Sequence, residues 1–160
     1  MSETRLGRIV LVGTDRRGRS AVLADGVSGV SITRPSGAVV HEIWRQQSLP
    51  VVAASVASDL EDAGEMAPLP PREGVSVRLF TLPPEVAPSV PVLNRSAAMH
   101  VATVVSGRAL LVLEASEVLL EAGDSFVIPG SLHAWRNPFD ETAVMVSTVL
   151  ALSSPPATGR

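Results

Sequence analysis

Three observations in the sequence predict a single all-β domain, built as an antiparallel sandwich or barrel. The chain has 160 residues and a mass of 16.7 kDa, which is the size of one domain. From Val75 onward, short segments rich in β-branched and apolar residues follow one another with only brief turns between them. No segment between these strands carries the apolar spacing of a helix, which argues against alternating strands and helices.

The N-terminal residues 1–74 are expected to form a β arm and a loop that pack on the barrel. Apolar runs broken by turn residues predict short strands at 7–12, 20–23, 30–33 and 39–46. Residues 47–74 are rich in proline and acidic residues and leave room only for a short helix at 59–63. We interpret 47–74 as a long loop over the surface or across the mouth of a pocket, and favour a mobile linker over a lid.

Residues 75–152 are expected to form the core of the barrel. The strand pattern there predicts strands at 75–82, 89–94, 99–105, 108–114, 117–121, 125–129, 132–137 and 143–152. Several of them are apolar on both faces, as expected of a strand that lies between the barrel interior and a second sheet. The last residues, 153–160, are expected to be a disordered tail.

Charge and composition exclude several classes of function. The net charge is −3 and no Lys/Arg run is longer than Arg16-Arg17, so no nucleic-acid partner is expected. No uncharged apolar run approaches the ~18–20 residues of a membrane span, and the polar N-terminus does not resemble a signal peptide. We therefore expect a cytoplasmic protein without a membrane partner. The absence of cysteine excludes disulfides, thiolate nucleophiles and sulfur ligands for a metal.

Few side chains in this sequence could carry chemistry. Lysine and tyrosine are absent, which excludes a Schiff base through a side-chain amine and a phenol acting as acid or base. His41, His100 and His133 are the only side chains that titrate near neutral pH. A serine hydrolase is not expected, because the sequence has no GxSxG elbow.

The segment GDSFVIPGSLHAWRN, from Gly123 to Asn137, resembles the second motif of the cupin superfamily. That motif is a Gly, five residues, a Pro, a turn containing Gly, a His, three residues and an Asn. Gly123, Pro129, His133 and Asn137 fall in this register, whereas Ser131 stands where the family usually has Gly. The likeness covers about residues 75–152 and implies an all-β fold, the cupin double-stranded β-helix or jelly-roll barrel with an N-terminal β arm.

The first cupin motif is degenerate in this sequence. In metal-binding members it supplies two His and a Glu, which hold a divalent metal together with the His of the second motif. Counting back from Gly107, these positions hold Asn94, Ser96 and His100. Their shared parity would place them on one face of a strand. The resemblance thus implies only two strong ligands, His100 and His133, with Asn94 as a third, and we expect no cofactor rather than Fe, Ni or Zn.

Strand alternation predicts an open and mostly apolar pocket. Ala98 and Ala102 share the parity of the motif residues, and their small side chains leave the barrel interior unfilled. Trp135 and Phe126 are expected to line its apolar wall. The expected catalytic residues are His100 and His133, and the expected substrate-binding residues are Asn94, Ser96, Ala98, Ala102, Phe126 and Trp135. Such a pocket suits a hydrophobic carbon skeleton that bears carbonyl or hydroxyl groups.

The leading hypothesis is a metal-independent enzyme that cyclises, isomerises or dehydrates an apolar, polyketide-like intermediate, because the likeness is to small cupins often encoded beside natural-product pathways. His100 and His133 would exchange protons with the substrate or stabilise its carbonyl oxygen. A metal-dependent oxygenase or isomerase and a non-catalytic protein that binds a hydrophobic ligand are the alternatives. The expected partners are a hydrophobic small molecule and a second copy of the chain in a homodimer, since the arm would otherwise expose apolar strand edges.

Overall fold

A computed structural model describes residues 8–27, 29–51 and 66–153 of the chain. This part of the chain forms eleven strands and no helix, so the all-β prediction is confirmed. No helix among these residues is long and apolar enough to cross a membrane. The short helix expected at 59–63 and the tail, apart from Ser153, lie outside the described residues.

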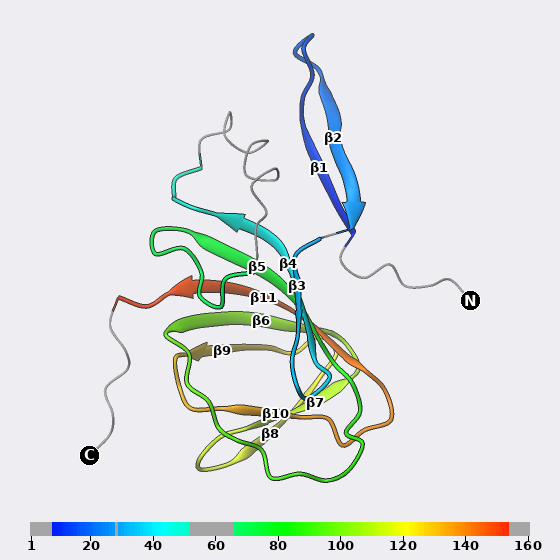
Figure 1. Cartoon of the computed structure of the whole chain (residues 1–160), viewed down its shortest axis with the longest axis vertical. Helices are drawn as coiled ribbons and strands as arrows, with labels where there is room; N and C mark the ends of the chain where they lie inside the picture. Colours follow the sequence, from blue (N-terminus) through cyan, green and yellow to red (C-terminus); the bar gives the residue numbers. More distant parts are fainter. Residues whose placement is uncertain (1–7, 28, 52–65, 154–160) are drawn as a thin grey trace.

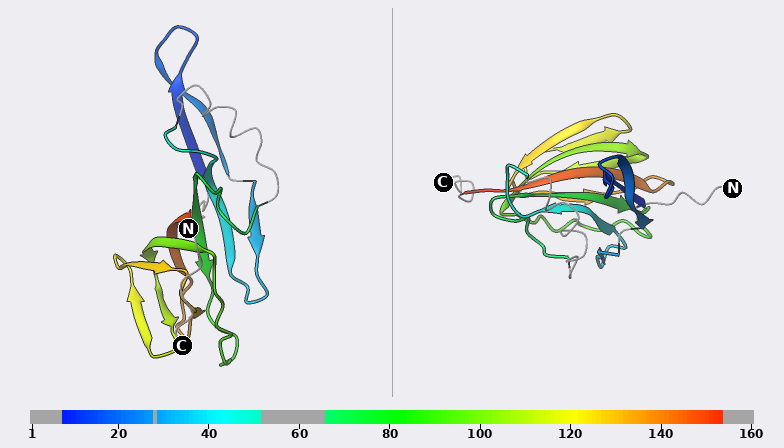
Figure 2. Two further views of the ribbon diagram at one scale, coloured as in Figure 1. Left: turned by 90° about the vertical axis from the view of Figure 1, so that its left-hand side faces the viewer. Right: turned by 90° about the horizontal axis from the view of Figure 1, so that it is seen from above.

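The barrel consists of an antiparallel sheet of six strands and a second antiparallel sheet of three (Figures 1 and 2). In order across the larger sheet the strands are β3 (Ser31–Thr33), β4 (Val39–Gln46), β5 (Val75–Leu82), β11 (Ala143–Ala151), β6 (Ala98–Ser106) and β9 (Ser125–Pro129). The smaller sheet has the order β10 (Ala134–Arg136), β7 (Arg108–Val112) and β8 (Glu117–Glu121). Because β11 lies between β5 and β6, strands distant in sequence form the middle of the larger sheet.

The core lies where the two sheets pack against each other. Ala109, Leu111 and Leu120 of the smaller sheet share one buried cluster with residues of the larger sheet, among them Val104 and Met145. Burying apolar side chains of this size stabilises a fold by about 1.5–3 kcal/mol each. Ala38, Leu82, Ile128 and Met145 of this cluster also line the cavity described below.

One predicted strand is wrong. Residues 89–97 form no strand, and only Asn94 makes an isolated bridge, to His133. The segment is interrupted by Pro88 and Pro91, which have no N–H to donate to a neighbouring strand. Strand β6 therefore begins at Ala98, and the expectation that residues 94 and 96 lie on the same strand as residue 100 is also wrong.

Three glycines of the cupin-like motifs, Gly107, Gly123 and Gly130, have the positive φ that favours glycine. Gly107, between β6 and β7, has φ +72°, and a Cβ there would lie 2.6 Å from the carbonyl oxygen of Thr142. Gly130 has φ +75° and follows the last residue of β9. The turn of the second motif therefore has its left-handed residue at Gly130. Ser131 does not need a positive φ, so a serine fits at that position.

Asn137 connects three parts of the barrel through its side chain. It is 0% exposed, and its Nδ2 donates hydrogen bonds of 2.8 Å to the carbonyl oxygens of Leu82 and Glu141. Its Oδ1 accepts a hydrogen bond from the backbone N–H of Phe139 at 3.1 Å. The side chain of Asn137 therefore has a structural role in the turn that contains Pro138.

The N-terminal arm divides into two parts. β1 (Arg8–Thr14) and β2 (Ser20–Val27) form a separate two-stranded hairpin that extends away from the barrel (Figure 1). β3 and β4, in contrast, belong to the six-stranded sheet, and β4 pairs with β5 along almost its whole length. The second part of the arm therefore contributes directly to the barrel wall.

Candidate functional site

A cavity of about 680 Å³ lies inside the barrel. Side chains from β4, β5, β6, β9, β10 and β11 line it, so both sheets contribute. The part of the long loop that the structure describes also contributes, through Pro68 and Leu69. The volume lies within the range of small-molecule sites, roughly 300–1,000 Å³.

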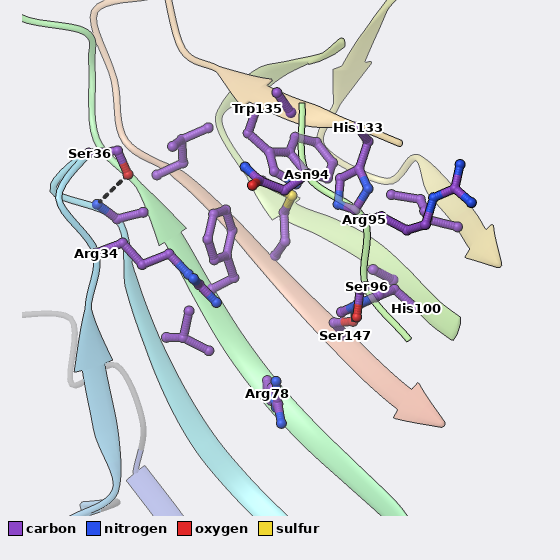
Figure 3. Close-up of a pocket in the computed structure, with 18 of the residues that line it drawn as sticks. Arg34, Ser36, Arg78, Asn94, Arg95, Ser96, His100, His133, Trp135 and Ser147 are labelled. Atoms are coloured by element: carbon purple, nitrogen blue, oxygen red, sulfur yellow. Dashed lines mark hydrogen bonds between the residues drawn. The ribbon is translucent and has the colours of Figure 1, made fainter. Parts of the chain in front are cut away.

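Seven of the eight residues expected at the site line this cavity. They are Asn94, Ser96, His100, Ala102, Phe126, His133 and Trp135. All of them except Ala102 and Phe126 are labelled in Figure 3. Ala98 does not border the cavity, although it is only 1% exposed, and Ala97 borders it instead. Ala98 is the first residue of β6 and shares the parity of His100 and Ala102, so strand alternation alone does not account for its absence from the lining.

Asn94 and His133 are held together by their backbones. The Asn94 N–H donates to the His133 carbonyl at 2.9 Å, and the His133 N–H donates to the Asn94 carbonyl at 3.1 Å. This bridge closes the barrel wall where β10 has not yet begun. It also fixes the backbone from which the His133 ring enters the cavity.

The imidazole of His133 is held in one orientation and one tautomer. Its Nδ1 lies 2.9 Å from the carbonyl oxygen of Ser131. A carbonyl oxygen can only accept, so Nδ1 carries a hydrogen, and in the neutral imidazole Nε2 then carries the lone pair. The ring also meets the Trp135 ring edge-on, at a centroid distance of 6.3 Å. Nε2 of His133 is therefore a proton acceptor with a fixed position.

His100 lies next to His133 and is kept neutral. The two ring centroids are 6.3 Å apart, with an interplanar angle of 63°. Burial is the largest cause that lowers the pKa of His100, to about 4, and the charge of His133 adds to it. The charges of Arg78 and Arg34 act in the same direction. Near neutral pH, His100 is thus an uncharged imidazole, and its Nδ1 lies 3.4 Å from Ser147 Oγ.

The rest of this side of the cavity is aromatic and aliphatic. Trp135 lies between Phe126, at a centroid distance of 5.2 Å, and Phe80, at 6.3 Å. Ile128 and Met145 add aliphatic surface to the lining. These groups offer no hydrogen bond to a bound molecule except through the Trp135 N–H, so they suit an apolar body.

The residues at the metal-ligand positions of the cupin motifs do not fit a divalent metal. No group of three or more His, Cys, Asp or Glu is placed to hold one among the described residues. Asn94 is exposed and its side-chain amide donates to the Val92 carbonyl at 2.9 Å. Beyond His100 and His133, the set offers an amide and the Ser96 hydroxyl, which are weak ligands for such an ion.

Sequence reasoning missed the polar residues on the β3–β5 side of the cavity. Arg34, Arg78 and Ser147 line it, together with Ser36 (Figure 3). The alternation of 75–82 could have indicated Arg78, since it shares its parity with Phe80 inside a strand that has no other charged residue. No comparable signal marks Arg34, which follows a strand of only three residues.

The comparisons with known proteins agree with this fold. A family model described as "Cupin domain" matches residues 78–149. The chain is 30% identical over 146 residues to the cupin-domain-containing oxidoreductase srdB of Neurospora crassa, a match that covers 90% of this chain and 67% of that protein. Among solved structures, KdgF from Halomonas sp. has a TM-score of 0.49 at 11% identity, covering 76% of this chain and 85% of that one. An RmlC-like cupin from Shewanella frigidimarina also has a TM-score of 0.49, at 12% identity, covering 78% and 85%. The chain belongs to the cupin family.

Proposed function

We propose that this cupin binds an apolar carbonyl compound of polyketide type and catalyses proton transfer on it without a metal, in a cyclisation, isomerisation or dehydration. The observation that carries the proposal is the pair of imidazoles in the cavity. One of them has a free and fixed Nε2, and the other is held neutral. The aromatic wall beside them supports an apolar substrate body.

In this mechanism His133 is the base and His100 stabilises the developing charge. Nε2 of His133 takes a proton from the carbon next to the substrate carbonyl. The electron pair of that C–H bond forms a C=C bond to the carbonyl carbon, and the π pair of the carbonyl moves to its oxygen. A neutral imidazole can donate a hydrogen bond to this oxygen through its N–H, as the neutral His100 does here. This role requires that Ser147, 3.4 Å away, donates its hydroxyl hydrogen to Nδ1 of His100, so that the ring hydrogen lies on Nε2.

The three reaction types differ in where the proton held by His133 goes next. Its return to another carbon of the enolate gives an isomer. Its transfer to a β-hydroxyl group, which leaves as water, gives dehydration. When the enolate carbon attacks a second carbonyl of the same molecule, transfer to the new alkoxide completes a cyclisation. Each path returns His133 to its starting state.

The test is deuterium exchange into 2-tetralone, an apolar ketone, followed by proton NMR in D₂O. The protein is expected to accelerate exchange next to the carbonyl. His133→Gln should reduce that rate by about 100-fold or more, within the range typical of a general base, and His100→Gln by a smaller factor. His41→Gln is the matched control, because His41 does not line the cavity. Exchange at the buffer rate with the unaltered protein would contradict the proposal.

An oxidoreductase is the second candidate, because the curated relative of this chain is called one. Such a reaction needs a redox-active group, and the described residues offer only two strong ligands for a metal. Elemental analysis of the purified protein separates the two candidates. One equivalent of Fe, Ni or Zn that both imidazole variants lose would support the metal-dependent reading.

A homodimer is a further part of the proposal. The β1–β2 hairpin exposes Val10, Val12, Val22 and Val27 and stands apart from the barrel, so a second copy could cover it. Light scattering after gel filtration should give twice the chain mass of 16.7 kDa. A single chain mass at micromolar concentration would exclude this.

A further inference from the structure

We infer that the cavity has a second polar end, where Arg34 and Arg78 bind a carboxylate of the ligand. The substrate would then be a carboxylic acid whose apolar, carbonyl-bearing body reaches the two imidazoles. This inference deepens the proposed function and rests on it for the reacting end of the substrate. The anion site itself stands on the charges, contacts and geometry of the β3–β5 side of the cavity.

The lining of the cavity is cationic although the chain is acidic. Arg34, Arg78 and Arg95 line it, whereas no Asp or Glu does among the described residues. The whole chain has a net charge of −3, so carboxylates are abundant elsewhere. An enclosed positive potential in a partly apolar cavity attracts an anion more strongly than the same charges do on an open surface.

Arg78 presents a buried and rigid guanidinium to this cavity. It is only 6% exposed, and its Nε donates to Ser76 Oγ at 3.0 Å. Its Nη1 donates to the Pro68 carbonyl at 3.2 Å and its Nη2 to the Ala67 carbonyl at 3.0 Å. These acceptors are uncharged, so they satisfy hydrogen bonds without neutralising the arginine.

Among the described residues, the one carboxylate that forms an ion pair with Arg78 balances it only in part. Glu42 Oε1 lies 4.0 Å from an Arg78 nitrogen, but only 2.9 Å from Arg45. The same oxygen accepts a hydrogen bond of 2.6 Å from the Ser76 hydroxyl. One carboxylate is thus shared between two arginines, and the pair with Arg45 has the shorter contact. Positive charge therefore remains at the wall of the cavity.

Arg34 adds a second cation that no protein contact explains. It follows β3, and its side chain extends toward the centre of the cavity (Figure 3). In the part of the chain that the structure describes, its guanidinium makes no hydrogen bond and no ion pair. Its charge lowers the pKa of both Arg78 and His100, which places all three groups in one electrostatic environment. A guanidinium can hold a carboxylate through two parallel N–H donors.

The distance between the two ends suits a substrate of two or three rings. Arg78 on β5 pairs with Ser147 on β11, and Ser147 contacts His100 on β6. Ser147 pairs with Ala102 on β6, which is two residues from His100. Two strand spacings of about 4.8 Å and an offset of two residues along the strand put the backbones of Arg78 and His100 roughly 12 Å apart. A carboxylate at the arginines and a carbonyl at the imidazoles can therefore belong to one molecule.

The experiment compares 2-naphthoate with its uncharged counterpart 2-naphthamide by isothermal titration calorimetry. The two probes share the aromatic body and differ in the anion. The unaltered protein is expected to bind 2-naphthoate at least ~10-fold more tightly, as charge-assisted hydrogen bonds predict. Arg34→Gln should reduce this ratio below about threefold and leave the affinity for 2-naphthamide unchanged. Arg34 is the residue of choice, because Arg78 also holds the loop carbonyls and its replacement can disturb the fold.

Arg16→Gln is the matched control. Arg16 lies in the turn of the β1–β2 hairpin, so its substitution removes the same charge far from the cavity. A ratio that stays at ten or more in Arg16→Gln supports the site. Equal affinities for the two probes in the unaltered protein overturn it, as does an equal loss of affinity for both probes in Arg34→Gln.

The exchange assay with the neutral 2-tetralone measures proton transfer by the imidazoles and does not depend on the anion site. If the protein accelerates exchange but binds the two naphthalene probes equally, the anion site is refuted and the proposed function stands. If it prefers 2-naphthoate but does not accelerate exchange, the proposed function alone is refuted.

Discussion

The two sides of the cavity differ in how their polar groups are held. On the imidazole side, His133 is fixed by a hydrogen bond to Ser131 and by a backbone bridge to Asn94. On the arginine side, Arg78 is fixed in the same way by carbonyls, but Arg34 has no such contact among the described residues. A group that reacts must be placed before the substrate arrives, whereas a group that recognises a charge can be ordered by the ligand. The comparison therefore assigns chemistry to one side and recognition to the other.

The largest expected effect concerns the stability of the imidazole side. Asn137→Ala leaves the carbonyls of Leu82 and Glu141 and the N–H of Phe139 without the side chain that serves them. The free energy of unfolding should fall by about 2–4 kcal/mol. Arg34→Gln should change it by less than about 0.5 kcal/mol, because Arg34 supports no part of the fold. Urea denaturation of both variants measures the difference, and similar losses in the two would mean that the arginine side is structural as well.

The second effect is the pH dependence that His100 gives to stability. Its pKa is about 4 in the folded protein and 6.5 in the unfolded chain, so between these values the unfolded state binds more protons. The free energy of unfolding therefore falls as the pH drops from 6.5 to 4. The contribution of His100 is on the order of 2 kcal/mol once solvent screening is allowed for. His100→Gln should remove it, and an unchanged slope in that variant would show that His100 is not desolvated.

The smallest effect couples the two sides directly. Arg34 lowers the pKa of His100 through space, so Arg34→Gln should raise it, while Arg16→Gln should not. Binding of 2-naphthoate should raise it in the same direction, because the carboxylate neutralises the arginine. Chemical-shift titration of the His100 ring carbons measures both changes. A His100 pKa that responds equally to both arginine variants would mean that the effect follows net charge and not the cavity.

The sequence predicted the imidazole side far better than the arginine side, for a physical reason. His133, Gly107 and Asn137 have fixed spacings because local turns and strand pairings require them, and such spacings are visible in the sequence. The expectation of a strand through residues 94 and 96 is wrong because strand alternation does not apply there. Pro91 has no N–H to donate to a neighbouring strand, and β6 begins only at Ala98. Asn94 and Ser96 still reach the cavity, but from a connection and not from a strand.

The arginine side depends on tertiary structure that no local pattern encodes. Arg34 and Arg78 are 44 positions apart in the chain and meet only because β4 pairs with β5 in one sheet. The loop carbonyls that hold Arg78 belong to residues 67 and 68, whose position could not be inferred from a proline-rich sequence. Those contacts also show that the described end of the 47–74 segment packs against the cavity.

The central claim is that the imidazoles themselves transfer protons. The most direct measurement is the rate of deuterium exchange into 2-tetralone before and after dialysis against a chelator, with the metal content determined on the same samples. The account predicts a metal content well below one per chain and an exchange rate that dialysis leaves unchanged. A divalent metal near one per chain, whose removal abolishes exchange and whose return restores it, would contradict the account.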